Sequence, residues 1–463
     1  MDGATLIAGI DAAAHEATLF AAIWFLVGGI DDLLVDLIYF GRRLCAWVHP
    51  SSAAPCPLAA PPPGRIAVFI PAWDESAVIG DMLRTALARF DHTDYVLYVG
   101  AYPNDPATIA AVRDVAAADC RVRLVIGGAP GPTTKADCLN KLWHAMLLDE
   151  AAQASAVVAV ALHDAEDVVH PLELRIYAQW LQRYSAIQLP VMPLPHPRSR
   201  LVAGHYCDEF AEAHGKSLVV RQALGAGMPL AGVGCAVRRD MLGRIADMRG
   251  DGPFDATSLT EDYELGLTVA ALGGETALVR VPERPGGRPV AVRAYFPDTL
   301  NAAIRQKARW LTGIALIGWD RTGWGRIEAI GDHWMRMRDR RATLAIPVLA
   351  IAYAAFAMWG TSLGSHLFVG SRPPGLPPLI VELLLTNAAL LVWRLSMRAL
   401  FVWRGYGVRE ALWSLPRVLV GNLIALFAAR RALLLYLKIL AGAAPRWDKT
   451  AHQFPDDVER VTA

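Results

Sequence analysis

The 463-residue chain has few cysteines, and their spacing excludes two kinds of site. All six are scattered, and no two of them form a Cys-x-x-Cys pair. A structural zinc site or a disulfide framework would need closer or paired cysteines, so the pattern fits a reducing compartment. The net charge of +1 is also small, and it gives no indication of a nucleic-acid partner.

Familiar phosphate-binding and targeting signals are missing as well. The chain has no Walker A motif, and no Gly-x-Gly-x-x-Gly follows the first predicted strand, which argues against NTPases and dinucleotide-binding enzymes. The apolar N-terminal segment, residues 18–40, lacks the basic leader and small-residue cleavage site of a signal peptide. We therefore interpret residues 1–48 as an N-terminal transmembrane anchor.

Hydrophobic residues are abundant, at 54% of the chain against 19% charged, and the mean hydropathy is +0.30. This composition suits a soluble domain with a few membrane spans. We predict a Pro/Ala-rich linker at residues 49–64, a basic amphipathic connector at 321–342 and two transmembrane helices within 343–402. Residues 403–441 are apolar but hold several arginines, which are costly in mid-bilayer, so we interpret them as interfacial or re-entrant helices. A fourth crossing is the alternative.

Charges beside the first span predict how the chain is oriented. Acidic residues precede the span and two arginines follow it at 42–43, so the positive-inside rule places the next domain in the cytoplasm. The tail at residues 442–463 is then cytoplasmic too. Within the first helix, Asp31, Asp32 and Asp36 share one side, which a membrane helix tolerates where that side faces protein or the interface.

Residues 65–320 alternate between strand and helix patterns. Strands are predicted at about 66–71, 95–100, 122–126 and 156–162, and helices at 75–90, from 106, and at 133–151. This order predicts an α/β fold with a mostly parallel, doubly wound sheet. Ligands of such sheets bind beyond the carboxyl ends of the strands, so the segments that follow these strands should share one cleft.

An acidic run follows the last of these strands. Asp164, Glu166 and Asp167 place three carboxylates within four residues. Their mutual repulsion favours a divalent cation, and oxygen ligands suit Mg2+ or Mn2+. The alternative is a solvated loop without a ligand.

Two predicted helix starts carry further candidates. Lys135 follows a Pro/Gly-rich loop, where it could meet an anion, and the alternative is a surface lysine. Ser258 and Glu261 have the spacing of a capping box, which accounts for Glu261 but not for Asp262. A carboxylate in the first helical turn is kept ionised by the helix dipole, so Asp262 is a candidate general base.

A third candidate segment is amphipathic and begins at Arg305. It could be a basic helix on the membrane surface. In a functional interpretation, Arg309 clamps a leaving diphosphate and Trp310 stacks on a sugar ring.

Together these motifs resemble membrane-bound family-2 glycosyltransferases with a GT-A fold. The matching segments are Pro71–Glu75, Lys135–Asn140, Asp164–Asp167, Thr260–Asp262 and Gln306–Trp310. The resemblance implies inverting, metal-dependent transfer from a nucleotide-sugar, with Asp262 as the base and Asp164, Glu166 and Asp167 on the metal. It implies donor contacts from Pro71, Ala72, Asp74, Glu75, Asp105, Lys135 and Arg309. It implies acceptor contacts from Gly232, Gly234, Glu261, Gln306 and Trp310.

Other segments are similar to the bacteriophage adsorption protein B family of inner-membrane glycosyltransferases. They are residues 98–106, 130–140, 163–167, 295–299 and 447–450. The similarity implies a multi-pass enzyme of the bacterial inner membrane that builds a surface exopolysaccharide, usable as a phage receptor. Implied partners are a UDP-linked donor, a growing glycan or lipid acceptor, the bilayer and an outer-membrane protein, but no nucleic acid. The alternative is transfer of a single sugar to a polyprenyl-phosphate.

The chain departs from these families at three places. Residues 100–105 replace the Asp-Asp-Gly turn that reads uridine in many family-2 enzymes, which leaves Asp105 as a substitute candidate. Glu166 stands where the acidic motif has its second Asp. The chain also ends soon after Thr450, where relatives can continue into a cyclic-di-GMP-sensing domain, so we expect that domain to be absent.

Overall fold

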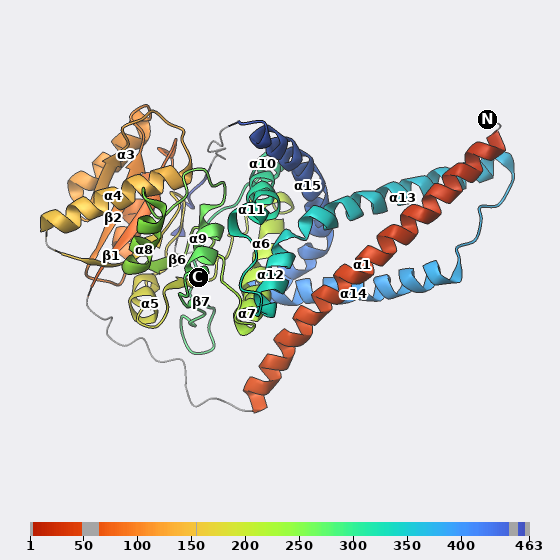
Figure 1. Cartoon of the computed structure of the whole chain (residues 1–463), viewed down its shortest axis with the longest axis horizontal. Helices are drawn as coiled ribbons and strands as arrows, with labels where there is room; N and C mark the ends of the chain where they lie inside the picture. Colours follow the sequence, from red (N-terminus) through yellow and green to blue (C-terminus); the bar gives the residue numbers. More distant parts are fainter. Residues whose placement is uncertain (1–2, 49–63, 154, 444–451, 459–463) are drawn as a thin grey trace.

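The computed structural model describes residues 3–48, 64–153, 155–443 and 452–458. It shows an α/β domain from which long helices project on one side (Figure 1). The predicted linker lies outside the described residues except for Gly64, and so does the segment 447–450.

One seven-stranded sheet forms the centre of the α/β domain, in the order β3-β2-β1-β4-β6-β5-β7. Four of its six strand pairings are parallel, and β6 is antiparallel to both of its neighbours. The predicted α/β fold is therefore confirmed. The strands are β1 (Arg65–Pro71), β2 (Tyr95–Ala101), β3 (Val122–Ile126), β4 (Val157–Leu162), β5 (Ala186–Gln188), β6 (Cys235–Arg238) and β7 (Thr276–Leu278).

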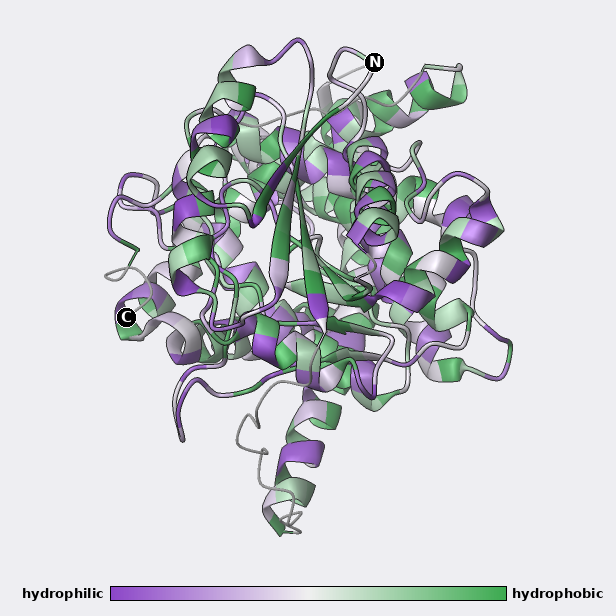
Figure 2. Ribbon diagram, turned by 90° about the vertical axis from the view of Figure 1, so that its left-hand side faces the viewer, coloured by the Kyte–Doolittle hydropathy of each residue, from purple (hydrophilic) through white to green (hydrophobic). Residues whose placement is uncertain are grey.

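Helices cover both faces of this sheet. Along β1, Ile66, Val68 and Ile70 enter one core and Ala67 and Phe69 the other, as the two-residue period of a strand requires. Figure 2 shows the hydrophobic strands in the middle with helices on either side. The first core is closed by α2 (Ile79–Arg89), α3 (Pro106–Ala118) and α5 (Glu173–Trp180), and the second by α4 (Lys135–Gln153), α8 (Arg239–Arg249) and α9 (Glu261–Ala271).

The helix that follows β1, α2, begins four residues later than the sequence predicts. Asp74 has a left-handed backbone with φ of 54°, and its N–H donates to Oδ2 of Asp105 at 2.6 Å. This turn keeps residues 71–75 out of the helix, which begins at Ile79. The segment therefore stays at the carboxyl edge of the sheet, where ligands of doubly wound folds bind.

A layer of shorter helices lies between the sheet and the long helices (Figure 1). It includes two π-helical turns, which are common at functional sites. Its members are α6 (Val202–Glu212), the π-helix Ala213–Ser217, α7 (Leu218–Ala223), α10 (Leu300–Trp310), the π-helix Leu311–Ile317, α11 (Gly318–Thr322) and α12 (Ile330–Arg340).

Four helices of the described chain are long and apolar enough to cross a membrane. They are α1 (Gly3–Val48), α13 (Ala342–Val369), α14 (Pro378–Tyr406) and α15 (Val408–Leu440). The first three project together from the domain, whereas α15 runs across their inner ends and contacts α6 and α10 (Figure 1). Residues 408–440 thus form one continuous helix rather than several. Arg417 of this helix pairs with Asp208 at 3.0 Å, which offsets the cost of burying it.

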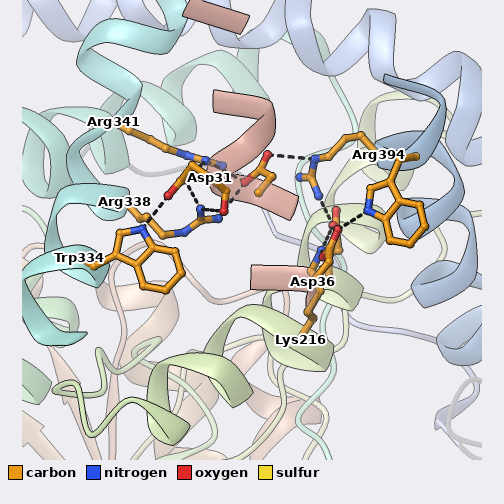
Figure 3. Close-up of polar contacts among 10 residues, drawn as sticks. Asp31, Asp36, Lys216, Trp334, Arg338, Arg341 and Arg394 are labelled. Atoms are coloured by element: carbon orange, nitrogen blue, oxygen red, sulfur yellow. Dashed lines mark hydrogen bonds and ion pairs between the residues drawn. The ribbon is translucent and has the colours of Figure 1, made fainter. Parts of the chain in front are cut away.

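The aspartates of α1 face protein, as expected. Asp31 accepts hydrogen bonds from Trp334 at 2.6 Å and from Arg341 at 2.9 Å (Figure 3). Asp36 is paired with Lys216, which lies in the layer of shorter helices. These contacts tie the first helix to α12 and to the π-helix after α6, so the anchor and the α/β domain are joined by buried ion pairs.

Candidate active site

One pocket at the carboxyl edge of the sheet gathers most of the predicted polar residues. They come from α4, the loop after β4, the start of α9 and the end of α10. The predicted residues that line it are Lys135, Asp164, Glu166, Asp167, Glu261, Asp262, Gln306, Arg309 and Trp310. The topological argument for parallel strands is therefore confirmed for the acidic run after β4, which lines the pocket, whereas the segments after β1 and β2 do not line it.

Lys135 is an ion-pair partner inside this pocket rather than a surface lysine. Its Nζ lies 2.6 Å from Oδ1 of Asp164 and 3.8 Å from Oε1 of Glu261, and its side chain is 12% exposed. Burial alone would lower the pKa of Lys135, but the surrounding carboxylates raise it. Burial would likewise raise the pKa of Asp164, yet Lys135 brings it below its ordinary value. Both groups are therefore charged at neutral pH.

Glu261 does not take part in the predicted capping box. The N-cap of α9 is Thr260, and the hydroxyl of Ser258 donates to Glu264 at 2.6 Å while its oxygen accepts the Thr260 N–H at 3.1 Å. Glu261 instead turns into the pocket toward Lys135. Burial raises the pKa of Glu261 to about 7, although the lysine opposes the shift. The capping-box interpretation is wrong, because Glu261 is the first residue of the helix and not the third residue after its N-cap.

Asp262 is the second carboxylate of this helix start. Its Oδ1 accepts a hydrogen bond from the Tyr263 N–H at 2.8 Å. Burial raises the pKa of Asp262, and Lys135 only partly offsets this. The helix dipole favours the ionised form, as the sequence predicts, but the loss of solvent acts in the opposite direction. A carboxylate with a raised pKa is a better proton acceptor once it is ionised.

Two glycines in the segment beside the pocket allow close approaches of the backbone, Gly232 to Asp262 and Gly234 to Val292. Gly232 has φ of 72°, and a β-carbon there would lie 2.7 Å from Oδ2 of Asp262. Gly234 has φ of 59°, and its β-carbon would lie 2.8 Å from a methyl of Val292. Left-handed backbone and close approach both require glycine here. Neither of the predicted acceptor glycines lines the pocket, although their neighbours Ala231 and Val233 do.

Asp167 turns toward the protein interior. Its Oδ2 lies 2.8 Å from Nδ1 of His163 and accepts the Asp164 N–H at 3.1 Å. Burial raises the pKa of Asp167 to about 7, despite the histidine. Asp167 therefore holds the acidic loop in shape, whereas Asp164 and Glu166 point to the pocket. The sequence could not separate these roles, because all three acids lie in one turn.

His452 completes the acidic side of the pocket, and the sequence analysis missed it. Its Nδ1 lies 2.9 Å from Oε1 of Glu75 and 3.2 Å from Oε2 of Glu166. Burial would lower the pKa of His452, but the two carboxylates raise it to about 10. The ligand atoms of these three side chains all lie within 4.8 Å of one another, so they could hold a metal ion. The nearest indication in the sequence was the similarity of residues 447–450 to the adsorption protein B family.

The end of α10 supplies groups that need a partner. Nε of Arg309 and Oε1 of Gln306 are buried without a hydrogen bond in the described structure. Trp310 packs edge-on to Tyr206 at 6.1 Å, and the Lys307 ammonium lies 5.0 Å from its ring. Buried unpaired polar atoms cost free energy, and at a pocket they indicate a ligand.

The predicted donor residues after β1 and β2 build the edge of the sheet. Asp105 accepts the Thr108 N–H at 3.3 Å as the N-cap of α3, besides holding Asp74. The Ala72 N–H donates to the backbone of β2, which extends the sheet after Pro71. Pro71, Ala72, Asp74 and Asp105 thus lie at the predicted edge of the sheet but do not line the pocket. Glu75, the fifth predicted donor residue of these segments, contacts His452 of the acidic cluster.

Comparisons with known proteins agree with this geometry. Residues 62–313 match the sequence profile of the family described as glycosyltransferase like family 2. The chain is 35% identical over 94% of its length to bacteriophage adsorption protein B of Escherichia coli strain K12. It is equally similar to bacteriophage N4 adsorption protein B of Escherichia coli O157:H7. The chain spans 61% of the length of these two relatives.

One solved structure shares the arrangement of nearly the whole chain. It is a mannosyltransferase from Pyrobaculum calidifontis, with a TM-score of 0.52 and 17% sequence identity. The match covers 92% of this chain and 99% of the mannosyltransferase. At this identity the likeness shows the fold alone, and it extends over the long helices as well as the sheet domain.

Proposed function

Since the chain belongs to the family-2 glycosyltransferases, we propose that it is an inverting, metal-dependent enzyme that extends an exopolysaccharide from a nucleotide-sugar. The observation that carries this proposal is the single pocket shared by Lys135, Asp164, Glu166, Asp262 and Arg309. It combines a candidate base, anion-binding cations and metal-binding carboxylates. Inversion needs one base and no protein nucleophile, and Asp262 fits that role.

Asp262 removes the proton from the acceptor hydroxyl as the new glycosidic bond forms. Gly232 lets the backbone close against Oδ2 of Asp262, which restricts where that oxygen lies. Arg309, with a buried unpaired Nε, stabilises the diphosphate as it leaves. Trp310 offers a ring face to the sugar of the acceptor. Lys135 keeps Asp164 ionised and lies next to the departing charge.

A divalent cation fits the acidic side of this pocket. Glu75, Glu166 and His452 would hold it, and Asp164, which lines the same pocket, is a further candidate for an oxygen ligand. A donor set that includes an imidazole suits Mn2+ better than Mg2+, which prefers oxygen ligands. When bound, the cation neutralises the charge that develops on the leaving diphosphate. The similar mannosyltransferase was solved with GDP-Man and Mn2+, which supports the same class of ligands here.

We place the enzyme in the bacterial inner membrane, with its pocket on the cytoplasmic side. The four apolar helices and the similarity to the adsorption proteins support this placement. The test is to incubate purified protein with a panel of nucleotide-sugars and Mn2+, and to measure free nucleoside diphosphate. We expect release from at least one donor together with a ladder of products on a gel. A product with a single added sugar would contradict polymer synthesis and support transfer to a polyprenyl-phosphate instead. No release of nucleoside diphosphate from any donor would contradict the whole proposal.

A further inference from the structure

A second cavity, of about 250 Å³, lies where the long helices meet the α/β domain. Its walls come from the ends of α1 and α14, from α6 and from the hairpin that follows β7. Phe210 lines both this cavity and the active-site pocket, so the two are neighbours. Four arginines line it: Arg43, Arg280, Arg288 and Arg404.

Among the residues that the structure describes, no acid lines this cavity. Within the described part of the chain, none of its four arginines forms an ion pair. Arg280 donates to the Gly215 carbonyl at 2.9 Å, and Arg43 contacts the Tyr39 hydroxyl at 3.4 Å. Glu283, an acid of the same hairpin, lies 3.4 Å from His170 instead. The cavity therefore holds an unbalanced cluster of positive charge.

Next to this cavity, where the same helices meet, positive side chains are paired with carboxylates. Figure 3 shows cations and carboxylates paired there, at the side of α1 that carries Asp31 and Asp36. The cations are Arg338, Arg341, Arg394 and Lys216, and the acids are Asp31, Asp32, Asp36 and Glu212. The four arginines of the cavity are exposed to solvent, but like charges that lie close together still repel one another. Desolvation together with Arg43 and Arg404 lowers the pKa of Arg280.

An anionic ligand would remove this imbalance. Guanidinium groups bind phosphate oxygens through two parallel hydrogen bonds, and several of them around one cavity suit a group with more than one negative charge. The volume is several times the roughly 30 Å³ that one water occupies in the liquid. Exposed Trp47 and Trp403, at 79% and 53%, lie near Arg43 and Arg404 in sequence, as is common at a membrane surface.

We propose that Arg43, Arg280, Arg288 and Arg404 form a binding site for a phosphate group. Its source is either the headgroup of an anionic phospholipid or a soluble phosphate-bearing molecule. Because the arginines come from α1, from α14 and from the α/β domain, the bound phosphate links the membrane helices to the domain. Ligand binding to the folded state then stabilises the whole chain.

The test measures thermal unfolding of the full-length protein in a neutral detergent with EDTA. The probes are short-chain phosphatidylglycerol, short-chain phosphatidylcholine and inorganic phosphate. We expect phosphatidylglycerol to raise the midpoint at concentrations where phosphatidylcholine does not. Inorganic phosphate should raise it as well if a soluble molecule is the source, and should have no effect if only a lipid headgroup is bound.

The double variant Arg280→Gln/Arg404→Gln should need about tenfold more of the active probe for the same stabilisation, or more. Arg280→Lys/Arg404→Lys keeps the charge and should respond in part, which separates loss of binding from a folding defect. Arg113→Gln, an exposed arginine on α3, is the matched control and should respond like wild type. Equal stabilisation of wild type and the double Gln variant, or no response to any probe, would overturn the proposal.

Discussion

Nδ1 of His452 lies 2.9 Å from Oε1 of Glu75, across 377 residues of sequence. The contact brings the C-terminal segment onto the loop after the first strand, beside Glu166 of the acidic loop. A carboxylate pair bridged by an imidazole is a donor set for a divalent metal. The relationship therefore connects the end of the chain to the proposed catalytic cation.

Removal of His452 should weaken metal dependence selectively. We expect His452→Ala to raise the Mn2+ concentration for half-maximal activity by about tenfold or more, because one ligand is lost. EDTA should abolish donor turnover in wild type, and added Mn2+ should restore it. The measurement is nucleoside diphosphate release during a metal titration, with Asp114→Asn on the exposed side of α3 as the control. Full turnover in EDTA would remove the metal from the mechanism.

Loss of the candidate base should reduce the rate without loss of donor binding. Asp262→Asn keeps the size of the side chain and its acceptor oxygen for the Tyr263 N–H. We expect transfer to fall by about 100-fold or more, the usual scale for acid–base catalysis. Steady-state kinetics and donor affinity, measured in parallel, separate the roles. A variant with weaker donor binding but an unchanged maximal rate would make Asp262 a binding residue.

The pH profile should report the environment of that base. The base acts only when ionised, so activity falls as the pH drops through the pKa of Asp262. Burial raises this pKa above 3.8, which moves the acidic limb to higher pH than for an ordinary aspartate. Lys135 opposes the shift, so Lys135→Gln should move the limb higher still. Lys141→Gln is the control, since this lysine pairs with Asp137 outside the pocket.

Gly232 should be needed for its lack of a side chain beside the base. In Gly232→Ala the new β-carbon would lie 2.7 Å from Oδ2 of Asp262, so this oxygen must move. We expect a clear loss of the maximal rate, besides the roughly 1–2 kcal/mol of left-handed strain. Gly225→Ala carries a similar φ of 66° with open space around it, so it should lose stability but not activity. Equal activity of the two variants would refute the steric argument.

The buried pair between α1 and the domain should show non-additive energetics. In Asp36→Leu the Lys216 ammonium and the Trp393 N–H lose a partner, which we expect to destabilise the protein by about 3 kcal/mol. After loss of Asp36, Glu212 at 2.8 Å is the remaining carboxylate partner of Lys216. The double variant Asp36→Leu/Lys216→Leu removes this buried ammonium and should recover part of the loss. Unfolding in detergent gives both values. A double variant no more stable than Asp36→Leu would show that the pair is not coupled.

The sequence predicted the architecture because its signals are local. Apolar runs gave the parallel strands, and the rule for parallel sheets placed Asp164 and Glu166, which follow β4, at the carboxyl edge of the sheet. Lys135 and Asp262 were predicted from the starts of their helices and not from this rule. Length and hydropathy located the long helices in the same way. The boundaries of these elements were predicted less well. The helix predicted to begin at residue 75 begins at Ile79, because Asp74 adopts a left-handed backbone in the preceding turn.

The roles of neighbouring side chains were decided only by the tertiary structure. Three acids of one loop look alike in sequence, yet burial against His163 turns Asp167 inward. Glu261 could cap its own helix, but Lys135 from another helix attracts it into the pocket. A pattern shows that a carboxylate is near a site. Which partner it takes depends on the charges and the burial that distant segments bring to it.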